Sequence, residues 1–299
     1  MQAVKLVECP RDAWQGLAKV IPTATKIAYL TRLLECGFRH IDAVSFVSPK
    51  YVPQMSDSEQ VMERLREELP RFPGAEIIGI VVNEHGFRRA LAAGVHTIGY
   101  PHSLSERFIR QNANISVAES RALVETMQRT LSELPNPPRF VAYISMAFGN
   151  PYGEPWEPDL VADTTRWLQS IGVQAVSLAD TVGRASVKDV VELLGRVNLQ
   201  HAGVEIGVHL HSRPEGALDK VLAAYDAGCR RFDSALTGLG GCPFANDHLV
   251  GNIPTEAVLN ALESRGAGAG IEREALADAL QATQELRQRY AAEEAVAQG

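Results

Sequence analysis

The sequence predicts an α/β fold in which eight parallel strands alternate with helices and close into a (β/α)8 barrel. Eight short apolar runs, most of them rich in Val and Ile, are bounded by Gly, Pro or polar residues, as buried strands are. Amphipathic segments lie between these runs, where parallel strands need crossover helices. A doubly wound open sheet is the alternative. No glycine-rich dinucleotide motif follows the first run, where Cys9-Pro10-Arg11-Asp12 stands instead, so the barrel is favoured.

The predicted strands are residues 4–9, 40–46, 77–82, 97–100, 140–146, 175–180, 205–211 and 231–237. Four helices between them are clear because each ends on a glycine, which reaches positive φ angles without strain. These helices cover residues 23–37, 84–94, 158–172 and 214–228. The next apolar run follows each glycine within about six residues, as expected of short loops from helix to strand.

No change of composition or low-complexity linker interrupts the chain, so we predict a single barrel domain over residues 1–299. Residues 271–299 are rich in Ala and charged side chains. We expect them to form an exposed helical tail whose last residues fray.

Composition excludes several classes of protein. The chain has 29 basic and 36 acidic residues and a net charge of −7, which argues against a nucleic-acid partner. It has no run of about 18 apolar residues, so no membrane span is expected, and its start does not resemble a signal peptide. Its four cysteines are scattered, which argues against a disulfide scaffold or a thiolate zinc site. We therefore expect a cytoplasmic protein.

Catalytic residues of a barrel lie where its strands end, at the C-terminal face. His209 and His211 end the seventh predicted strand, and side chains two residues apart on a strand share a face, about 6–7 Å apart. Both imidazoles could bind one divalent ion, although the pair could also be two unrelated polar residues. Asp12 would add an oxygen ligand from across the mouth, a set that suits Mg²⁺, Mn²⁺, Fe²⁺ or Zn²⁺. Arg11 could stabilise an oxyanion; the alternative is an exposed charged pair.

Other polar residues follow the strand ends and have structural alternatives. Cys242 lies in a glycine-rich stretch, residues 238–252, where it could enter the site on loop closure or pack as a small buried side chain. Lys50 could contact an anionic substrate or remain solvated. Asn150 could bind substrate or form a polar turn, and Asp180 could support the mouth or cap a helix. The candidates in the second strand are Asp42 and Ser45.

Four separated motifs resemble the hydroxymethylglutaryl-CoA lyase family, which belongs to a group of metal-dependent lyases and synthases on a (β/α)8 barrel. The motifs are SFVSPKYVPQM (45–55), SLADTVG (177–183), VHLH (208–211) and GLGGCPFA (238–245). The resemblance extends over residues 4–265. It implies an acyl-CoA substrate, a divalent metal for which we favour Mg²⁺ or Mn²⁺, and a homodimer.

The resemblance also implies roles for single residues. The implied metal ligands are Asp12, His209, His211 and Asn252. Arg11 would face the thioester, His209 or a metal-linked group would act as base, and Cys242 would close over the substrate as an acid. The residues implied or expected to contact substrate are Gln15, Asp42, Ser45, Lys50, Asn150 and Asp180. Asp42 stands where the family usually has a glutamate.

The implied reaction is a retro-Claisen cleavage of a 3-hydroxy-3-methylglutaryl-CoA-type substrate to acetoacetate and acetyl-CoA. One alternative is a lyase for citramalyl-CoA or a related 3-hydroxyacyl-CoA. A second is a Claisen-condensing acyltransferase, but such enzymes usually carry a C-terminal extension. A metal-dependent hydrolase and a silent scaffold are more distant alternatives. The segment from Cys242 to Asn252 is one residue longer than usual and Trp14 adds bulk near the mouth, so we interpret the chain as a divergent subgroup.

Overall fold

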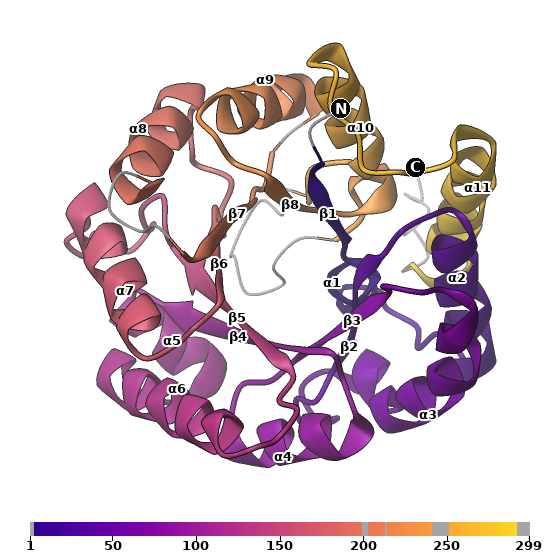
Figure 1. Ribbon diagram of the computed structural model, residues 1–299, viewed down its shortest axis with the longest axis horizontal. Coiled ribbons are helices and arrows are strands. Elements are labelled where there is room, and N and C mark those ends of the chain that lie inside the picture. The colour runs from indigo at the N-terminus through magenta and orange to yellow at the C-terminus, as the bar shows by residue number, and fades with distance from the viewer. Residues whose placement is uncertain (1–2, 199–202, 213, 241–250, 292–299) are drawn as a thin grey trace, which may run out of the picture.

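The computed structural model describes residues 3–198, 203–212, 214–240 and 251–291. Its strands form one closed barrel in which each strand pairs in parallel with the next and the last pairs with the first (Figure 1). The strands are β1 (Lys5–Glu8), β2 (His40–Ser45), β3 (Glu76–Ile80), β4 (Thr97–Ser103), β5 (Arg139–Ser145), β6 (Ala175–Ala179), β7 (Glu205–His209) and β8 (Arg231–Ser234). The predicted barrel is confirmed, and the open sheet is excluded.

Some strand ends differ from the prediction. β4 continues past residue 100 to Ser103, because it keeps its pairing with β5 through Ser103 and Ser145. β7 ends at His209, so His211 lies beyond the strand and forms an isolated antiparallel bridge with Asn252. β8 ends at Ser234 and a short 3₁₀ turn follows it. These changes place His211 and the turn after β8 at the C-terminal mouth.

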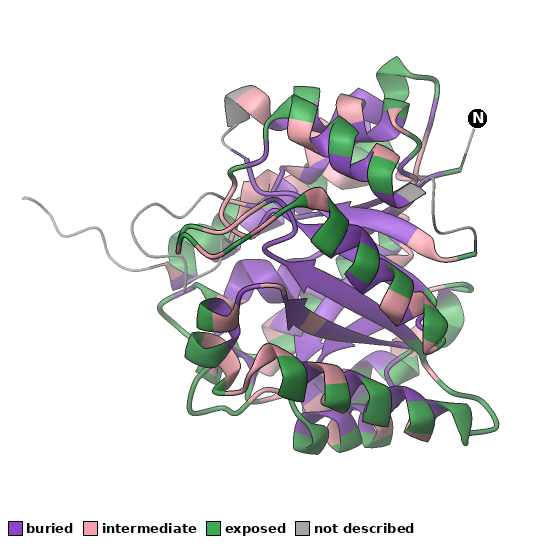
Figure 2. Ribbon diagram, turned by 90° about the vertical axis from the view of Figure 1, so that its left-hand side faces the viewer, coloured by how far each residue is buried: buried purple, intermediate pink, exposed green. Residues whose placement is uncertain are grey.

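Helices surround the barrel, and their outward faces carry the exposed residues while the strands inside are buried (Figure 2). They are α1 (Pro10–Gln15), α2 (Thr23–Glu35), α3 (Ser58–Glu68), α4 (Glu84–Ala93), α5 (Glu106–Ala113), α6 (Val117–Ser132), α7 (Pro158–Ser170), α8 (Val187–Asn198), α9 (Pro214–Asp226), α10 (Thr255–Ser264) and α11 (Arg273–Tyr290). The four predicted helices are confirmed as α2, α4, α7 and α9. The glycine after each of them has positive φ, between 70° and 104°. Within the described ranges, no helix is both long enough and apolar enough to cross a membrane.

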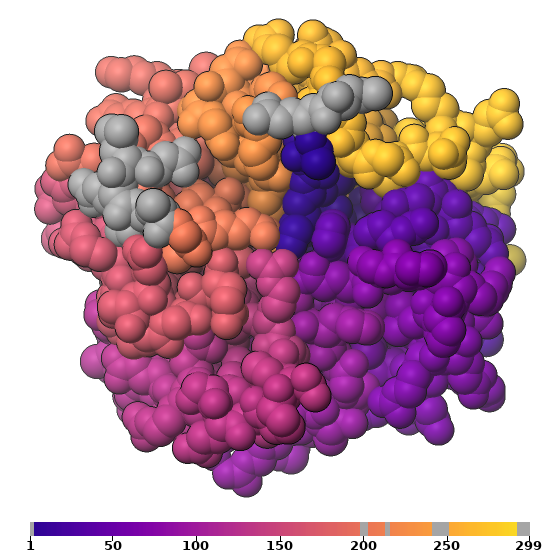
Figure 3. All heavy atoms as spheres, viewed as in Figure 1, coloured from indigo at the N-terminus to yellow at the C-terminus, as the bar shows by residue number. Residues whose placement is uncertain are grey.

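The C-terminal helix α11 packs against the start of the barrel. Its inner face buries Ala279, Ala282 and Leu286, and a 2.7 Å hydrogen bond joins the hydroxyls of Thr283 and Tyr29 on α2. Figure 3 shows this yellow segment beside the violet N-terminal helices. Residues 273–290 form the predicted helix, but one face is buried where an exposed tail is expected, because apolar side chains recur every third or fourth residue on that face. Residues 292–299 lie outside the described chain.

Buried Glu8 makes the stability of the barrel depend on pH. Glu8 is the last residue of β1. The backbone N–H of Leu236 donates to its Oε1 at 2.8 Å, and the hydroxyl of Thr255 donates to its Oε2. Burial raises the pKa of Glu8 to about 8. The folded chain therefore holds a proton that the unfolded chain releases near pH 4.3. This contribution to stability is complete below that pH and is lost as pH rises through about 8.

We expect Glu8→Gln to flatten this pH dependence, because glutamine keeps an acceptor without a charge. Between about pH 5 and pH 8.5, the Tm of the wild type should fall more steeply than that of the variant. Thermal melts across this range measure the difference. Glu67→Gln, at an exposed position of α3, serves as the control and should follow the wild type. Parallel curves for wild type and Glu8→Gln would contradict the assignment.

Candidate active site

A cavity of about 310 Å³ opens at the C-terminal mouth of the barrel. It collects side chains from α1, which follows β1, and from the C-terminal ends of β2 to β7 and the segments after them. The predicted site residues that line it are Arg11, Asp12, Gln15, Ser45, His209 and His211. Apolar and aromatic side chains complete the wall, among them Ile80, Phe108 and Tyr143. Such a cavity, mostly apolar with a few convergent polar groups, is typical of a small-molecule site.

The short helix α1 fixes Arg11 at this mouth. It follows β1 directly and begins with Pro10, whose ring suits a first helical position. The guanidinium of Arg11 donates from Nε to Asp42 Oδ1 at 3.1 Å, and its Nη2 forms a second bond to Asp42 Oδ2. Nη1 donates to Asp12 Oδ1 at 3.0 Å and to Gln15 Oε1 at 3.3 Å. Four bonds therefore hold the planar group in one orientation.

The charges on Arg11 and Asp12 stabilise each other. Burial opposes the charge of Arg11, but the carboxylates of Asp42 and Asp12 raise its pKa above the usual value. Burial likewise opposes the charge of Asp12, but Arg11 and the two histidines lower its pKa overall. Both side chains are therefore ionised near neutral pH. A fixed cation and a fixed anion stand side by side at the edge of the cavity.

The two histidines lie next to each other, as the sequence predicts. Their ring centroids are 5.1 Å apart, and both side chains are buried. Burial disfavours protonation of His209, but Asp233 and Asp12 raise its pKa. The bridge between His211 and Asn252 brings the segment before α10 to the same place. There Asn252 Nδ2 donates to Asp12 Oδ2 at 2.9 Å.

The chemistry of a divalent-metal site is present in four of these side chains, namely Asp12, His209, His211 and Asn252. Over the described ranges, no three His, Cys, Asp or Glu side chains already surround a common point, because Asp12 faces Asn252 and Gln15. The donor set nevertheless fits a cation. It consists of two imidazoles, an ionised carboxylate and the Asn252 amide, whose oxygen would face the cation after a flip of the side-chain amide.

Four of the predicted substrate residues do not line the cavity. Asp42 lies beneath it and holds Arg11. Lys50 is exposed, with its ammonium 5.8 Å from the ring centroid of Tyr51. Asn150 shapes its own loop, since its Oδ1 accepts bonds from the backbone N–H groups of Tyr152 and Glu154.

Asp180 also supports the mouth from behind. Its carboxylate accepts hydrogen bonds from the backbone N–H groups of Arg184 and Ala185, and it pairs with buried Lys220 at 3.3 Å. Trp14 does not add bulk to the mouth: it is buried on the outer side of α1, where it packs edge-on against Tyr29. The expectation for Trp14 is wrong because α1 turns its apolar side toward α2. Cys242 lies outside the described residues.

Sequence reasoning missed several buried polar groups: Tyr143 in the cavity wall, and Ser177, Arg231 and Asp233 beneath it. Tyr143 stacks edge-on against His209 with ring centroids 6.0 Å apart. Asp233 lies 3.6 Å from His209 Nδ1. The signal was present, because Arg231 and Asp233 alternate on one strand, and alternate residues of a barrel strand point inward.

Comparison with known proteins identifies the family of the chain. The HMGL-like family profile matches residues 3–283. Hydroxymethylglutaryl-CoA lyase of Pseudomonas mevalonii is 34% identical over 278 residues, which are 93% of this chain and 90% of that protein. The solved HMG-CoA lyase of Brucella melitensis is 35% identical with a TM-score of 0.87, and the match covers 96% of this chain and 100% of that one.

A further solved HMG-CoA lyase, from Acinetobacter baumannii, is in complex with coenzyme A and 3-methylmalate. It is 30% identical with a TM-score of 0.86, and the match covers 99% of this chain and 95% of that one. Both the family profile and these relatives extend over the whole barrel. The chain therefore belongs to the hydroxymethylglutaryl-CoA lyase family of carbon–carbon lyases, as its four motifs predict.

Proposed function

We propose that the chain cleaves 3-hydroxy-3-methylglutaryl-CoA to acetoacetate and acetyl-CoA at the mouth of the barrel. The observation that carries the proposal is the placement of Arg11, charged and held by four bonds, beside Asp12 and the His209–His211 pair in one cavity. The relatives that match nearly the whole chain are named for this substrate, which favours it over citramalyl-CoA and over the condensing reaction.

The cation in this cavity would be held by Asp12, His209, His211 and Asn252, and we favour Mg²⁺ or Mn²⁺. When bound, a divalent cation makes the hydroxyl of a substrate more acidic and orients it. Asp12 contributes charge, because its pKa is lowered and it stays ionised. The histidines would contribute imidazole nitrogens at and just beyond the end of β7.

The protein side chains then divide the reaction between them. A base accepts the proton of the C3 hydroxyl, and we assign this role to His209 or to a metal-linked group. As the C3 oxygen becomes a ketone, the bond from C3 to C2 breaks, and its electron pair forms the enolate of acetyl-CoA. Arg11 stabilises the negative enolate oxygen from a fixed position, so no reorganisation is needed during the reaction. An acid, which we assign to Cys242, returns a proton to C2 and completes acetyl-CoA.

Alkylation should test the role of Cys242 because the other thiols are protected. Cys9, Cys36 and Cys229 are free and buried, and burial raises the pKa of Cys36 to about 11 and that of Cys229 to about 12. We expect N-ethylmaleimide to label Cys242 first and to abolish activity, with protection by bound substrate. Peptide mapping identifies the labelled thiol. Full activity of protein labelled at Cys242 would contradict a catalytic thiol.

Product identification tests the proposed reaction. Purified protein with Mg²⁺ or Mn²⁺ is incubated in parallel with 3-hydroxy-3-methylglutaryl-CoA and with citramalyl-CoA, and the products are identified by mass spectrometry. We expect acetoacetate and acetyl-CoA from the first and a much lower rate with the second. Preferential cleavage of citramalyl-CoA to pyruvate and acetyl-CoA would replace the proposed substrate with the alternative.

We also propose that the enzyme is a cytoplasmic homodimer. The buried free thiols of the described chain suit a reducing compartment, and the dimer rests on the family resemblance. Light scattering coupled to size-exclusion chromatography tests the dimer: a mass near twice 32.5 kDa is expected.

A further inference from the structure

The geometry points to Asp233 as a positioning residue for His209. We propose that Asp233, itself held by Ser177 and Arg231, fixes the ring of His209 so that its other nitrogen faces the cavity. This inference rests on the proposed role of His209 as a metal ligand. It concerns residues below the cavity, which the proposed reaction does not itself use.

The first observation is the surroundings of His209 Nδ1. This buried atom has no hydrogen-bond partner within the described chain, yet it faces Asp233 Oδ2 at 3.6 Å. His209 and Asp233 are register partners on the adjacent strands β7 and β8. Both point into the barrel, so a shift of a few tenths of an ångström would form the bond. Contacts of this kind often shorten only when a site is occupied.

The second observation is that the carboxylate of Asp233 is itself fixed. Ser177 on β6 donates its hydroxyl to Asp233 Oδ2 at 2.7 Å. Arg231 Nη2 lies 3.4 Å from Asp233 Oδ1, and both side chains are almost completely buried. The partners come from a different strand and from the same strand two residues earlier. The 2.7 Å bond from Ser177 holds the oxygen that faces His209.

The third observation is the space made for Arg231. Its aliphatic chain crosses β7 at Gly207, where a Cβ atom would lie only 2.6 Å from Cδ and 2.7 Å from Cγ of Arg231. Any side chain at Gly207 would therefore displace Arg231. Gly207 precedes His209 by two residues and lies on the same inward face. Because Gly207 has no side chain, Arg231 can pass beneath His209 and reach the carboxylate of Asp233.

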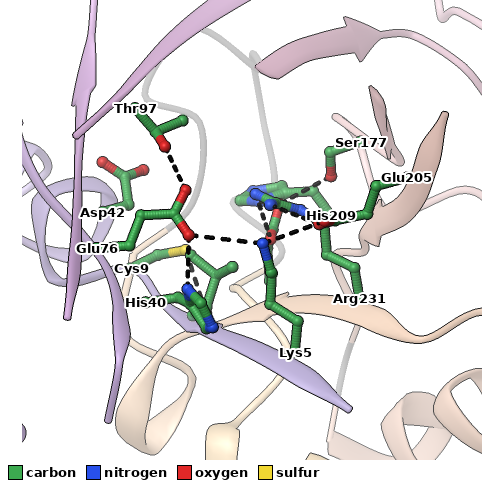
Figure 4. Close-up of polar contacts among 12 residues, drawn as sticks. Lys5, Cys9, His40, Asp42, Glu76, Thr97, Ser177, Glu205, His209 and Arg231 are labelled. Carbon is green, nitrogen blue, oxygen red and sulfur yellow. Dashed lines mark hydrogen bonds and ion pairs between the residues drawn. The ribbon is translucent and has the colours of Figure 1, made fainter. Parts of the chain in front are cut away.

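Arg231 connects this group to the other end of the barrel. Its Nη1 donates to Glu205 Oε1 at 3.1 Å, and Glu205 pairs with Lys5 at 3.1 Å. Lys5 in turn pairs with Glu76 at 3.5 Å, and Glu76 contacts His40 at 2.7 Å. Figure 4 follows these contacts from His209 and Arg231 to His40. We call this chain of contacts the ionic column; it runs through Asp233, Arg231, Glu205, Lys5, Glu76 and His40. Glu76 belongs to it without contacting Asp233.

A histidine that donates one ring N–H to a carboxylate presents its other nitrogen in a fixed tautomer and direction. Loss of such an outer partner typically weakens metal binding about 10- to 100-fold. The inference therefore predicts a change in metal affinity that does not depend on substrate. This readout separates it from the proposed reaction.

The test compares Asp233→Asn with Glu76→Gln, two changes that each remove one charge from the ionic column. The dissociation constant of Mn²⁺ is measured by electron paramagnetic resonance of the free ion, and Tm is measured alongside. We expect Asp233→Asn to weaken Mn²⁺ binding about 10- to 100-fold. Glu76→Gln should leave Mn²⁺ binding unchanged, even where it lowers Tm.

Unchanged Mn²⁺ affinity in folded Asp233→Asn would overturn the inference, and so would equal weakening in both variants. If Asp233→Asn does not fold, Ser177→Ala is measured in the same way, because it keeps the charge and removes one donor. Weaker Mn²⁺ binding by Ser177→Ala then supports the inference, and unchanged binding overturns it. A wild type that binds Mn²⁺ but does not cleave the proposed substrate overturns only the proposed function.

Discussion

Arg11→Lys is expected to lower kcat about 100- to 1,000-fold, the usual loss when a donor to a developing oxyanion is removed. Lysine keeps the positive charge, but its single nitrogen cannot reproduce the planar group that bonds both oxygens of Asp42 and also Asp12. The charge would then lose its fixed direction toward the enolate. Because that interaction strengthens only in the transition state, kcat should fall with little change in KM. Steady-state kinetics with 3-hydroxy-3-methylglutaryl-CoA measure the split.

A surface pair provides the matched control. Arg265 bonds both oxygens of Asp226 at 2.9 Å and 2.7 Å in the same two-bond geometry, but the pair is exposed and lies outside the cavity. Arg265→Lys should leave kcat unchanged. A rise of KM at constant kcat in Arg11→Lys would mean that Arg11 binds the substrate without stabilising the enolate.

His211→Ala is expected to remove most metal affinity while the barrel stays folded. The side chain lies beyond the end of β7, so its loss leaves the ladder between β7 and β8 intact. Removal of a ligand should cost more than the roughly 10- to 100-fold that loss of an outer partner costs. Activity should fall in parallel and recover partly at high Mn²⁺ concentration. Mn²⁺ titration and thermal melts measure affinity and folding separately.

His85→Ala, on the exposed side of α4, controls for the loss of an imidazole and should bind Mn²⁺ as the wild type does. If His211→Ala retains wild-type Mn²⁺ affinity and turnover at low metal, His211 is not a ligand. His209→Ala would then be the decisive second variant, since this change removes both a proposed metal ligand and the proposed base.

The fold was predictable because its signals are local. Each strand is a short apolar run, and Gly37, Gly94, Gly172 and Gly228 mark helix ends through their positive φ angles. The strand ends were less predictable, since they depend on pairing with a neighbour. β7 stops at His209 because His211 pairs with Asn252 instead, a contact between residues 41 positions apart. The burial of α11 against α2 likewise depends on a tertiary contact that α11 alone does not reveal.

The site was predictable where its residues follow strand ends, as Arg11, Asp12 and the two histidines do. Residues predicted from loops do not contact the cavity. Asn150 binds the backbone of its own loop through its side-chain oxygen. Asp180 did the same with Arg184 and Ala185. Sequence reasoning could not distinguish a polar side chain that shapes a loop from one that faces the cavity. Asp233 was missed because its partners Ser177 and His209 come from other strands.

Cleavage in D₂O tests the central claim, that the cavity breaks a carbon–carbon bond through an enolate. If the enolate of acetyl-CoA forms at Arg11 and is protonated by an exchangeable acid, acetyl-CoA should carry one deuterium in its methyl group at early times. Acetoacetate should appear in equal amount. Mass spectrometry of both products gives the result directly. Acetyl-CoA without deuterium, or free coenzyme A with intact 3-hydroxy-3-methylglutarate, would contradict the retro-Claisen account.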